Sequence, residues 1–293
     1  MANREIHTES VKILNGNLEI DAYLAMPIGE GLFPGVVVLQ EIFGVNEHIR
    51  DVTRRLAREG YVAIAPALYQ RQSPGFETGY TAEDIKIGKQ YKEQTKADNL
   101  LSDIQAAIDY LISQTPTRAK AIGCIGFCFG GLVAYLAATL PDIQATASFY
   151  GAGITTMTPG GGEPTITRTK DIRGGTIYLF FGMEDASIPA EQVDKIEDAL
   201  NKHQVLHQIF RYEKADHGFF CDQRASYNEA AAADAWVQVK HLFRQELVLA
   251  YSWIFVPRLL TKQSQTEGWS VKYEVWSSNS RDSSRGLQSG HPY

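Results

Sequence analysis

The sequence predicts an α/β fold, with a mostly parallel central sheet that carries helices on both faces in a three-layer sandwich. Short runs of continuously apolar residues, such as residues 35–40, are typical of strands buried on both faces of a parallel sheet. Segments with apolar residues at helical spacing, such as residues 98–112, alternate with these runs. Strands and helices that alternate in this way form βαβ units with right-handed crossovers.

The predicted elements follow one another in a regular order. Two strand-like segments, residues 5–14 and 18–26, are separated by Asn15-Gly16, a strong signal for a hairpin turn. The later strands are predicted over residues 35–40, 61–66, 121–127, 145–150, 176–181 and 207–212. The helices are predicted over residues 49–59, 98–112, 131–140, 190–202 and 227–244.

Two stretches interrupt this order. Residues 69–97 are polar and contain Ser73-Pro74-Gly75, which predicts a loop or lid beside the sheet. Residues 157–162, with the sequence MTPGGG, predict a flexible loop.

The C-terminal part of the chain has a different composition. Residues 261–293 are rich in Ser and Gln and show almost no aliphatic periodicity, so they bury too little apolar surface to offset their ordering entropy. We predict one domain over residues 1–246 and a poorly ordered extension over residues 247–293. A docking tail is the alternative, because Trp253, Trp269 and Trp276 lie in this part.

Composition limits the partners. The 293 residues carry a net charge of -6, which argues against nucleic acid or an anionic membrane as the main partner. The longest apolar stretch, residues 247–260, is shorter than the about 20 residues that span a bilayer. The first residues lack the apolar segment of a signal peptide, and three scattered cysteines fit a reducing compartment. We therefore expect a cytoplasmic protein that acts on a small molecule.

The motif with the clearest chemical meaning is Gly126-Phe127-Cys128-Phe129-Gly130, between a predicted strand and a predicted helix. A glycine, a nucleophile and a second glycine at this spacing form the nucleophile elbow of the α/β-hydrolase fold. The following helix N-terminus favours an anion, here the reactive thiolate of Cys128. The alternative is that Cys128 is a small buried apolar residue, as most free cysteines are.

A nucleophile at an elbow needs a base and an acid, which follow it in that fold in the order nucleophile, acid, histidine. Asp185 follows the strand predicted over residues 176–181, and His217 follows the next predicted strand. Both therefore lie at the carboxyl edge of the sheet, where such folds build their sites. Asp216 and Glu184 are weaker alternatives to Asp185.

The third element is the segment Gln40-Glu41-Ile42-Phe43, after the first buried parallel strand. In this fold the turn supplies one backbone N–H of the oxyanion hole, and the residue after the nucleophile supplies the other. This assigns the hole to Ile42 and Phe129. Glu41 stands at the end of an apolar strand, so we expect it to face the site; the alternative is an ordinary surface glutamate.

Taken together, the segments QEIFGVN, APALYQRQSPG, GFCFGG, GMEDASIP and ADHGF resemble those of dienelactone hydrolases, or carboxymethylenebutenolidases, over residues 5–245. The resemblance implies a triad of Cys128, His217 and Asp185. It implies that Glu41 holds the resting thiol and accepts its proton when substrate enters. It also implies a monomer that needs no metal or cofactor and hydrolyses dienelactone to maleylacetate.

The sequence departs from this family where the substrate carboxylate is recognised. The best-studied members use two arginines, one after the SPG turn and one soon after the histidine. Here the first region offers Lys86 and Lys89, and the position four residues after His217 is Cys221. The nearest arginine is Arg224. The candidate substrate-binding residues are Lys86, Tyr91, Arg224 and Phe43.

Three other functions compete with this interpretation. A general esterase or thioesterase would use the same mechanism on another small acyl substrate. A redox-sensing protein would use Cys128 as a reactive thiol without turnover. A metal-dependent hydrolase has the least support, because the sequence lacks the usual spacing of metal ligands.

Overall fold

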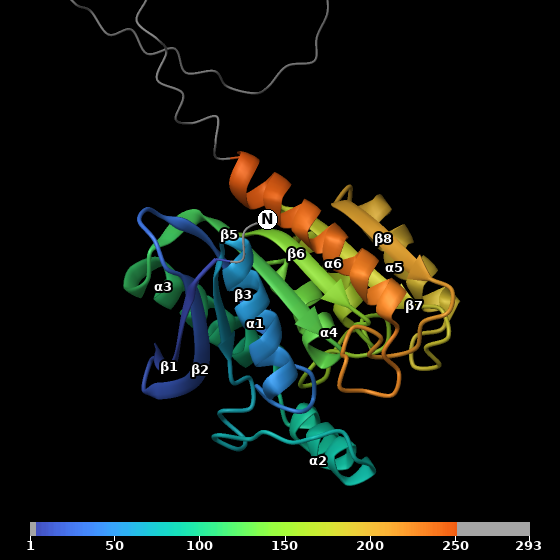
Figure 1. Cartoon of the computed structure of the whole chain (residues 1–293). Coiled ribbons are helices and arrows are strands. Elements are labelled where there is room, and N and C mark those ends of the chain that lie inside the picture. Colours follow the sequence, from blue (N-terminus) through green and yellow to red (C-terminus); the bar gives the residue numbers. More distant parts are fainter. Residues whose placement is uncertain (1–3, 251–293) are drawn as a thin grey trace, which may run out of the picture. The chain divides into compact units, whose positions relative to one another are not determined.

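The computed structural model describes residues 4–250, in which eight strands form one sheet in the order β1-β2-β4-β3-β5-β6-β7-β8 (Figure 1). The neighbouring strands β4, β3, β5, β6, β7 and β8 all run parallel to one another. The prediction of a mostly parallel sheet is therefore confirmed. Their bounds are β1 Ile6–Asn15, β2 Leu18–Pro27, β3 Phe33–Leu39, β4 Val62–Pro66, β5 Thr117–Phe127, β6 Ile143–Phe149, β7 Thr176–Gly182 and β8 Leu206–Tyr212.

Helices cover both faces of the sheet, as the sequence predicts. In Figure 1, α1 and α6 lie on one face, while α3 and α4, which contact each other, lie on the other. The bounds are α1 Glu47–Glu59, α2 Ala82–Glu93, α3 Ala97–Gln114, α4 Phe129–Ala137, α5 Ala190–Lys202 and α6 Glu229–Phe243. A 3-10 helix covers Thr165–Asp171, and a π-helical turn covers Arg244–Leu249.

Local chemistry explains where these elements begin and end. The predicted hairpin is confirmed, with Asn15 paired to Leu18 across the turn. Helix α1 begins where the side chain of Asn46 accepts a hydrogen bond from the Ile49 N–H, which satisfies an otherwise unpaired donor. The helix ends at Gly60, whose φ of 101° suits a residue without a Cβ.

The prediction of a loop over residues 69–97 was wrong for α2. This helix has a weak apolar pattern, and Gly88 is its only buried residue, so periodicity could not reveal it. Its signal is instead a capping box, in which the Thr81 side chain accepts from the Asp84 N–H and Asp84 accepts from the Thr81 N–H.

The core of the domain continues to the end of the described residues. Leu247 is fully buried, and a Cβ added to Gly123 would lie 2.8 Å from its Cδ1 atom. The rest of the predicted extension, residues 251–293, lies outside the described residues. Among residues 4–250, none of the helices combines the length and the hydropathy that a bilayer crossing requires.

A buried carboxylate joins three distant segments. Asp103, on α3, accepts two hydrogen bonds from Arg71, at 3.2 and 2.7 Å, and one from Asn15 at 2.7 Å. The Asp103 side chain is 3% exposed and that of Arg71 is 31% exposed. The ion pair therefore ties the hairpin turn and the segment after β4 to α3.

Replacing Arg71 with Met should lower the free energy of unfolding by about 2 kcal/mol, because Asp103 would keep its charge in a buried place with one donor left. Urea denaturation measures this loss. Arg168→Met is the matched control, since Arg168 and its partner Asp171 are both more than one-third exposed and their pair contributes less than about 1 kcal/mol. Equal losses in the two variants would contradict the role given to Asp103.

Candidate active site

Five side chains converge at the carboxyl ends of neighbouring parallel strands. Glu41 follows β3, Cys128 follows β5, Tyr150 follows β6, Asp185 follows β7 and His217 follows β8. Sheet order brings these strand ends together, although the residues are far apart in the sequence. Open α/β sheets bind their ligands at this edge.

Cys128 occupies a strained turn between β5 and α4. Its φ and ψ of 54° and -114° are unusual for a residue with a side chain. A Cβ at Gly126 would lie 1.9 Å from the Gly130 carbonyl oxygen, and a Cβ at Gly131 would lie 2.2 Å from that of Phe149. The glycines around Cys128 therefore permit a turn that no larger residues could make.

His217, which is partly buried, pairs with the buried Asp185. The Nδ1 atom of His217 lies 2.6 Å from Oδ2 of Asp185, whose Oδ1 accepts from the Ser187 N–H at 2.8 Å. Asp185 therefore orients the ring and leaves Nε2 for Cys128. Burial alone would lower the pKa of His217, but the negative charge of Cys128 and hydrogen bonds to Asp185 and Cys128 raise it to about 10. The environment thus favours the protonated imidazole of His217.

Glu41 is fully buried and holds an ion pair with Arg224. Its Oε1 accepts from Arg224 Nη1 at 3.1 Å, while its Oε2 has no hydrogen-bond partner among residues 4–250. Burial raises the pKa of Glu41 above its ordinary value, against the opposing charges of Arg224 and His217. No hydrogen bond joins Glu41 to Cys128 in this part of the chain. Glu41 is nevertheless close enough for its charge to act on His217.

Arg224 reaches the site through an opening that a glycine provides. A Cβ at Gly218 would lie 2.3 Å from Arg224 Nη1, so a larger residue there would block the guanidinium. The guanidinium carbon lies 5.7 Å from the Phe43 ring centroid and 5.8 Å from that of Tyr80. Two predicted substrate-binding residues, Phe43 and Arg224, thus meet beside Glu41.

The other two predicted substrate-binding residues lie elsewhere. Lys86 is exposed on α2 and, in the described part of the chain, forms no hydrogen bond or ion pair with the site. Tyr91 contacts Phe76, with ring centroids 4.7 Å apart, and Tyr69, which stacks on Phe129. Tyr91 therefore supports the residue that follows the nucleophile.

The predicted oxyanion-hole residues occupy suitable positions. Phe129 is the first residue of α4, where backbone N–H groups have no acceptor within the helix. The Ile42 turn lies under α2, because a Cβ at Gly88 would come within 2.3 Å of the Ile42 carbonyl oxygen. Gly88 thus lets α2 close over this turn, a contact that the sequence did not reveal.

Sequence reasoning also missed Tyr150. Its ring packs edge-on to that of His217, with centroids 5.2 Å apart, and its φ is 36°. Its buried hydroxyl has no hydrogen-bond partner within residues 4–250, and burial raises its pKa above the ordinary value. No sequence motif marks Tyr150, because its contact with His217 depends on the strained backbone conformation after β6.

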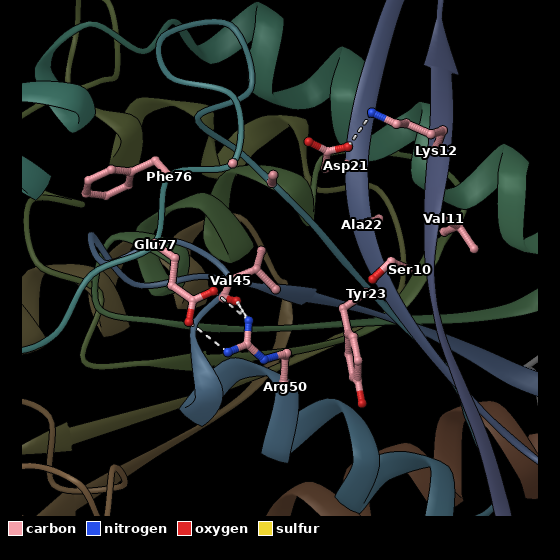
Figure 2. Close-up of a pocket in the computed structure, with 12 residues that line it drawn as sticks. Ser10, Val11, Lys12, Asp21, Ala22, Tyr23, Val45, Arg50, Phe76 and Glu77 are labelled. Atoms are coloured by element: carbon pink, nitrogen blue, oxygen red, sulfur yellow. Dashed lines mark hydrogen bonds and ion pairs between the residues drawn. The ribbon is translucent and has the colours of Figure 1, made fainter.

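A cavity of about 340 Å³ lies outside this site, between the β1–β2 hairpin and the Gly75–Glu77 segment (Figure 2). Figure 2 shows its four charged side chains paired, with Lys12 2.7 Å from Asp21 and Arg50 2.6 Å from Glu77. None of the predicted site residues lines it. Paired charges of this kind are typical of structural contacts. The candidate catalytic site is therefore the one at the carboxyl ends of the strands.

Comparisons with known proteins identify the family that this chain resembles. The model of the dienelactone hydrolase family matches residues 20–247. The chain is 59% identical over 243 residues to a Synechocystis sp. protein named carboxymethylenebutenolidase, covering 83% of this chain and 98% of that protein. It is 31% identical over 240 residues to a Bradyrhizobium sp. protein named 2-oxo-3-(5-oxofuran-2-ylidene)propanoate lactonase, covering 80% and 93%. A dienelactone hydrolase crystal structure from Klebsiella pneumoniae has a TM-score of 0.75 and 33% identity, covering 82% and 99%.

The electrostatic arrangement predicts an order of His217 pKa values that histidine NMR titration can measure. The value should be highest in the unmodified protein, lower in Cys128→Ser, and lowest in Cys128→Ser/Asp185→Asn. Each change removes a negative neighbour that stabilises the imidazolium, so less of the ring stays protonated as pH rises towards 10. The same titration in all three proteins would contradict the pairing of these residues.

Proposed function

The chain belongs to the dienelactone hydrolase family, and from that premise we propose that it hydrolyses a small enol lactone or activated ester with Cys128 as the nucleophile. Membership makes the chain a hydrolase of lactone or ester substrates. The observation that carries the proposal is the strained elbow at Cys128, at the same sheet edge as the His217–Asp185 pair.

The first step releases the thiolate. We propose that Glu41 takes the proton of the Cys128 thiol, since a base must have an accessible protonated form and burial favours that form of Glu41. A substrate carboxylate that binds Arg224 would draw this arginine away from Glu41. The protonated form of Glu41 would then be favoured further, so substrate binding would itself promote thiolate formation.

Acyl transfer follows from the geometry of the elbow. The thiolate attacks the ring carbonyl carbon, and the developing oxyanion is received by the backbone N–H groups of Ile42 and Phe129. The ring C–O bond then breaks, and the enolate takes a proton from the imidazolium of His217 and becomes a ketone, which leaves His217 neutral. The acyl group remains on Cys128 as a thioester. His217, oriented by Asp185, activates water to hydrolyse this thioester and regenerate the thiolate.

Leaving-group chemistry narrows the substrate class. A thiolate is a better leaving group than an unprotonated amine, so a tetrahedral intermediate from an amide would revert. An enol lactone or activated ester expels a stabilised anion and proceeds. The name of the Bradyrhizobium relative describes an unsaturated lactone with a propanoate group. Arg224, which contacts Phe43 and Glu41, supports recognition of such a carboxylate here.

We expect the following for dienelactone turnover. Cys128→Ser should lower kcat/KM by about a thousandfold or more, because Glu41 cannot ionise a serine hydroxyl. Glu41→Gln should lower it by about a hundredfold or more, because the amide accepts no proton. Glu184→Gln is the matched control, since Glu184 is an exposed acid on the same sheet edge, and it should stay within about twofold.

The outcomes separate the competing functions. Turnover of an activated aryl ester without turnover of dienelactone would keep the triad and indicate an esterase or thioesterase of another substrate. No turnover of either compound would favour a reactive-thiol protein. Activity that survives Cys128→Ser unchanged would contradict the nucleophile.

Arg224→Gln tests recognition of the substrate carboxylate. The ratio of kcat/KM for dienelactone to kcat/KM for an uncharged aryl ester should fall by about tenfold to a hundredfold, the effect of losing a charged hydrogen bond. The effect of the substitution on Glu41 in the free enzyme acts on both substrates and cancels in the ratio, so the change in the ratio reports what the substrate carboxylate gains from Arg224. An unchanged ratio would show that another residue binds the carboxylate.

A further inference from the structure

Three buried groups with metal-ligating atoms meet beside the triad. Glu41 follows β3, His48 belongs to α1 and Cys221 follows the turn that carries His217. One carboxylate oxygen, one imidazole nitrogen and the thiol sulfur all lie within 4.8 Å of one another. The mechanism described above uses neither His48 nor Cys221.

Two of these side chains present unpaired polar atoms. Oε2 of Glu41 and Nε2 of His48 have no hydrogen-bond partner among residues 4–250, although the two residues are 0% and 3% exposed. Buried polar atoms are almost always paired in proteins. Two unpaired atoms in one cluster therefore point to a group that binds between them.

The surroundings of His48 suit a metal ligand. The His48 ring lies edge-on to Phe127 and Phe220, with centroids 5.4 and 6.3 Å apart. Such apolar surroundings favour the neutral imidazole, which is the form that binds metals. The buried Cys221 would release its proton to solvent on binding and supply a thiolate.

We propose that Glu41, His48 and Cys221 form a binding site for Zn²⁺, which takes one oxygen, one nitrogen and one sulfur ligand and leaves a fourth position open. Zn²⁺ accepts all three ligand types, whereas Mg²⁺ and Ca²⁺ require oxygen ligands. Ligand atoms of a tetrahedral Zn²⁺ lie about 3.3–3.8 Å apart. The side chains must therefore close by about 1 Å.

Neighbouring residues orient two of the ligands. Arg224 holds Oε1 of Glu41 and leaves Oε2 for the metal, while Sγ of Cys221 lies 3.4 Å from the Tyr80 hydroxyl. Such outer contacts fix metal ligands in place. The positive charge of Arg224 also repels a cation, so Zn²⁺ binds here more weakly than in a structural zinc site and exchanges with the medium.

Zn²⁺ at this site inhibits the hydrolase, because a Glu41 carboxylate bound to the metal cannot take the thiol proton. This effect on turnover rests on the proposed function, whereas binding of the metal does not. The two are therefore tested by separate measurements.

Binding is measured with Cd²⁺, whose bonds to thiolates give an ultraviolet charge-transfer band, in Cys128→Ala protein that lacks the catalytic thiol. We expect one Cd²⁺ per chain and displacement by Zn²⁺. The band should disappear in Cys128→Ala/Cys221→Ser, and His48→Gln in the same background should weaken binding at least about tenfold. Cys128→Ala/Cys124→Ala is the matched control, because Cys124 is also buried but lies outside the cluster, and it should keep the band.

The result that would overturn the site is specific. Absence of the band in Cys128→Ala protein, or a band that survives Cys221→Ser, excludes Cys221 as a ligand. Thermal unfolding of each variant shows that it is folded, and His48→Gln tests the site independently if Cys221→Ser is unstable.

Inhibition of the unmodified enzyme by Zn²⁺ should be reversed by a chelator and be at least tenfold weaker in Cys221→Ser. Binding without inhibition would keep the site and contradict the role of Glu41.

Discussion

The turn between β5 and α4 leaves no room for a side chain at Gly126 or Gly131, which lie before and after Cys128 in the sequence. Added Cβ atoms at Gly126 and Gly131 would lie 1.9 and 2.2 Å from backbone carbonyl oxygens, distances that atoms cannot occupy. This close packing holds Cys128 at a φ of 54° and fixes its sulfur at the N-terminus of α4. The remaining site residues follow the carboxyl ends of β3, β6, β7 and β8, so the site depends on this turn more than on any single hydrogen bond.

Charge balance is the second constraint on the site. Glu41 and Asp185 are buried carboxylates, and each lies against a cationic partner, Arg224 and His217 respectively. A buried charge without a partner is costly, so neither pair can be broken without a replacement. Under the proposed function, a substrate carboxylate at Arg224 is such a replacement for Glu41. Binding of an acidic substrate would then favour protonation of Glu41 and, through it, formation of the Cys128 thiolate.

Most of the fold could be predicted because its signals are local and repeated. Buried strands read as apolar runs, and α5 was predicted at its observed bounds because its apolar face is strong. Helix α2 was missed because its stability comes from a capping box and from contact with the Ile42 turn. Cys128, Asp185 and His217 meet because their motifs follow one another along the chain in the same order as β5, β7 and β8 follow one another in the sheet. The place of Tyr150 in the site and the approach of Arg224 past Gly218 could not be predicted, because backbone strain and side-chain length leave no periodic pattern in the sequence.

The departure from the family pattern near His217 has a structural counterpart. Cys221 stands four residues after His217, and the guanidinium near the site comes from Arg224 through the space that Gly218 leaves. Under the proposed function, Arg224 takes the role in carboxylate recognition that the resemblance assigns to an arginine soon after the histidine. Cys221 also places a small thiol beside Glu41 and His48, where an arginine would offer no ligand atom to a metal. The proposed metal site therefore depends on the cysteine at position 221, and the charge of Arg224 on Glu41 weakens it.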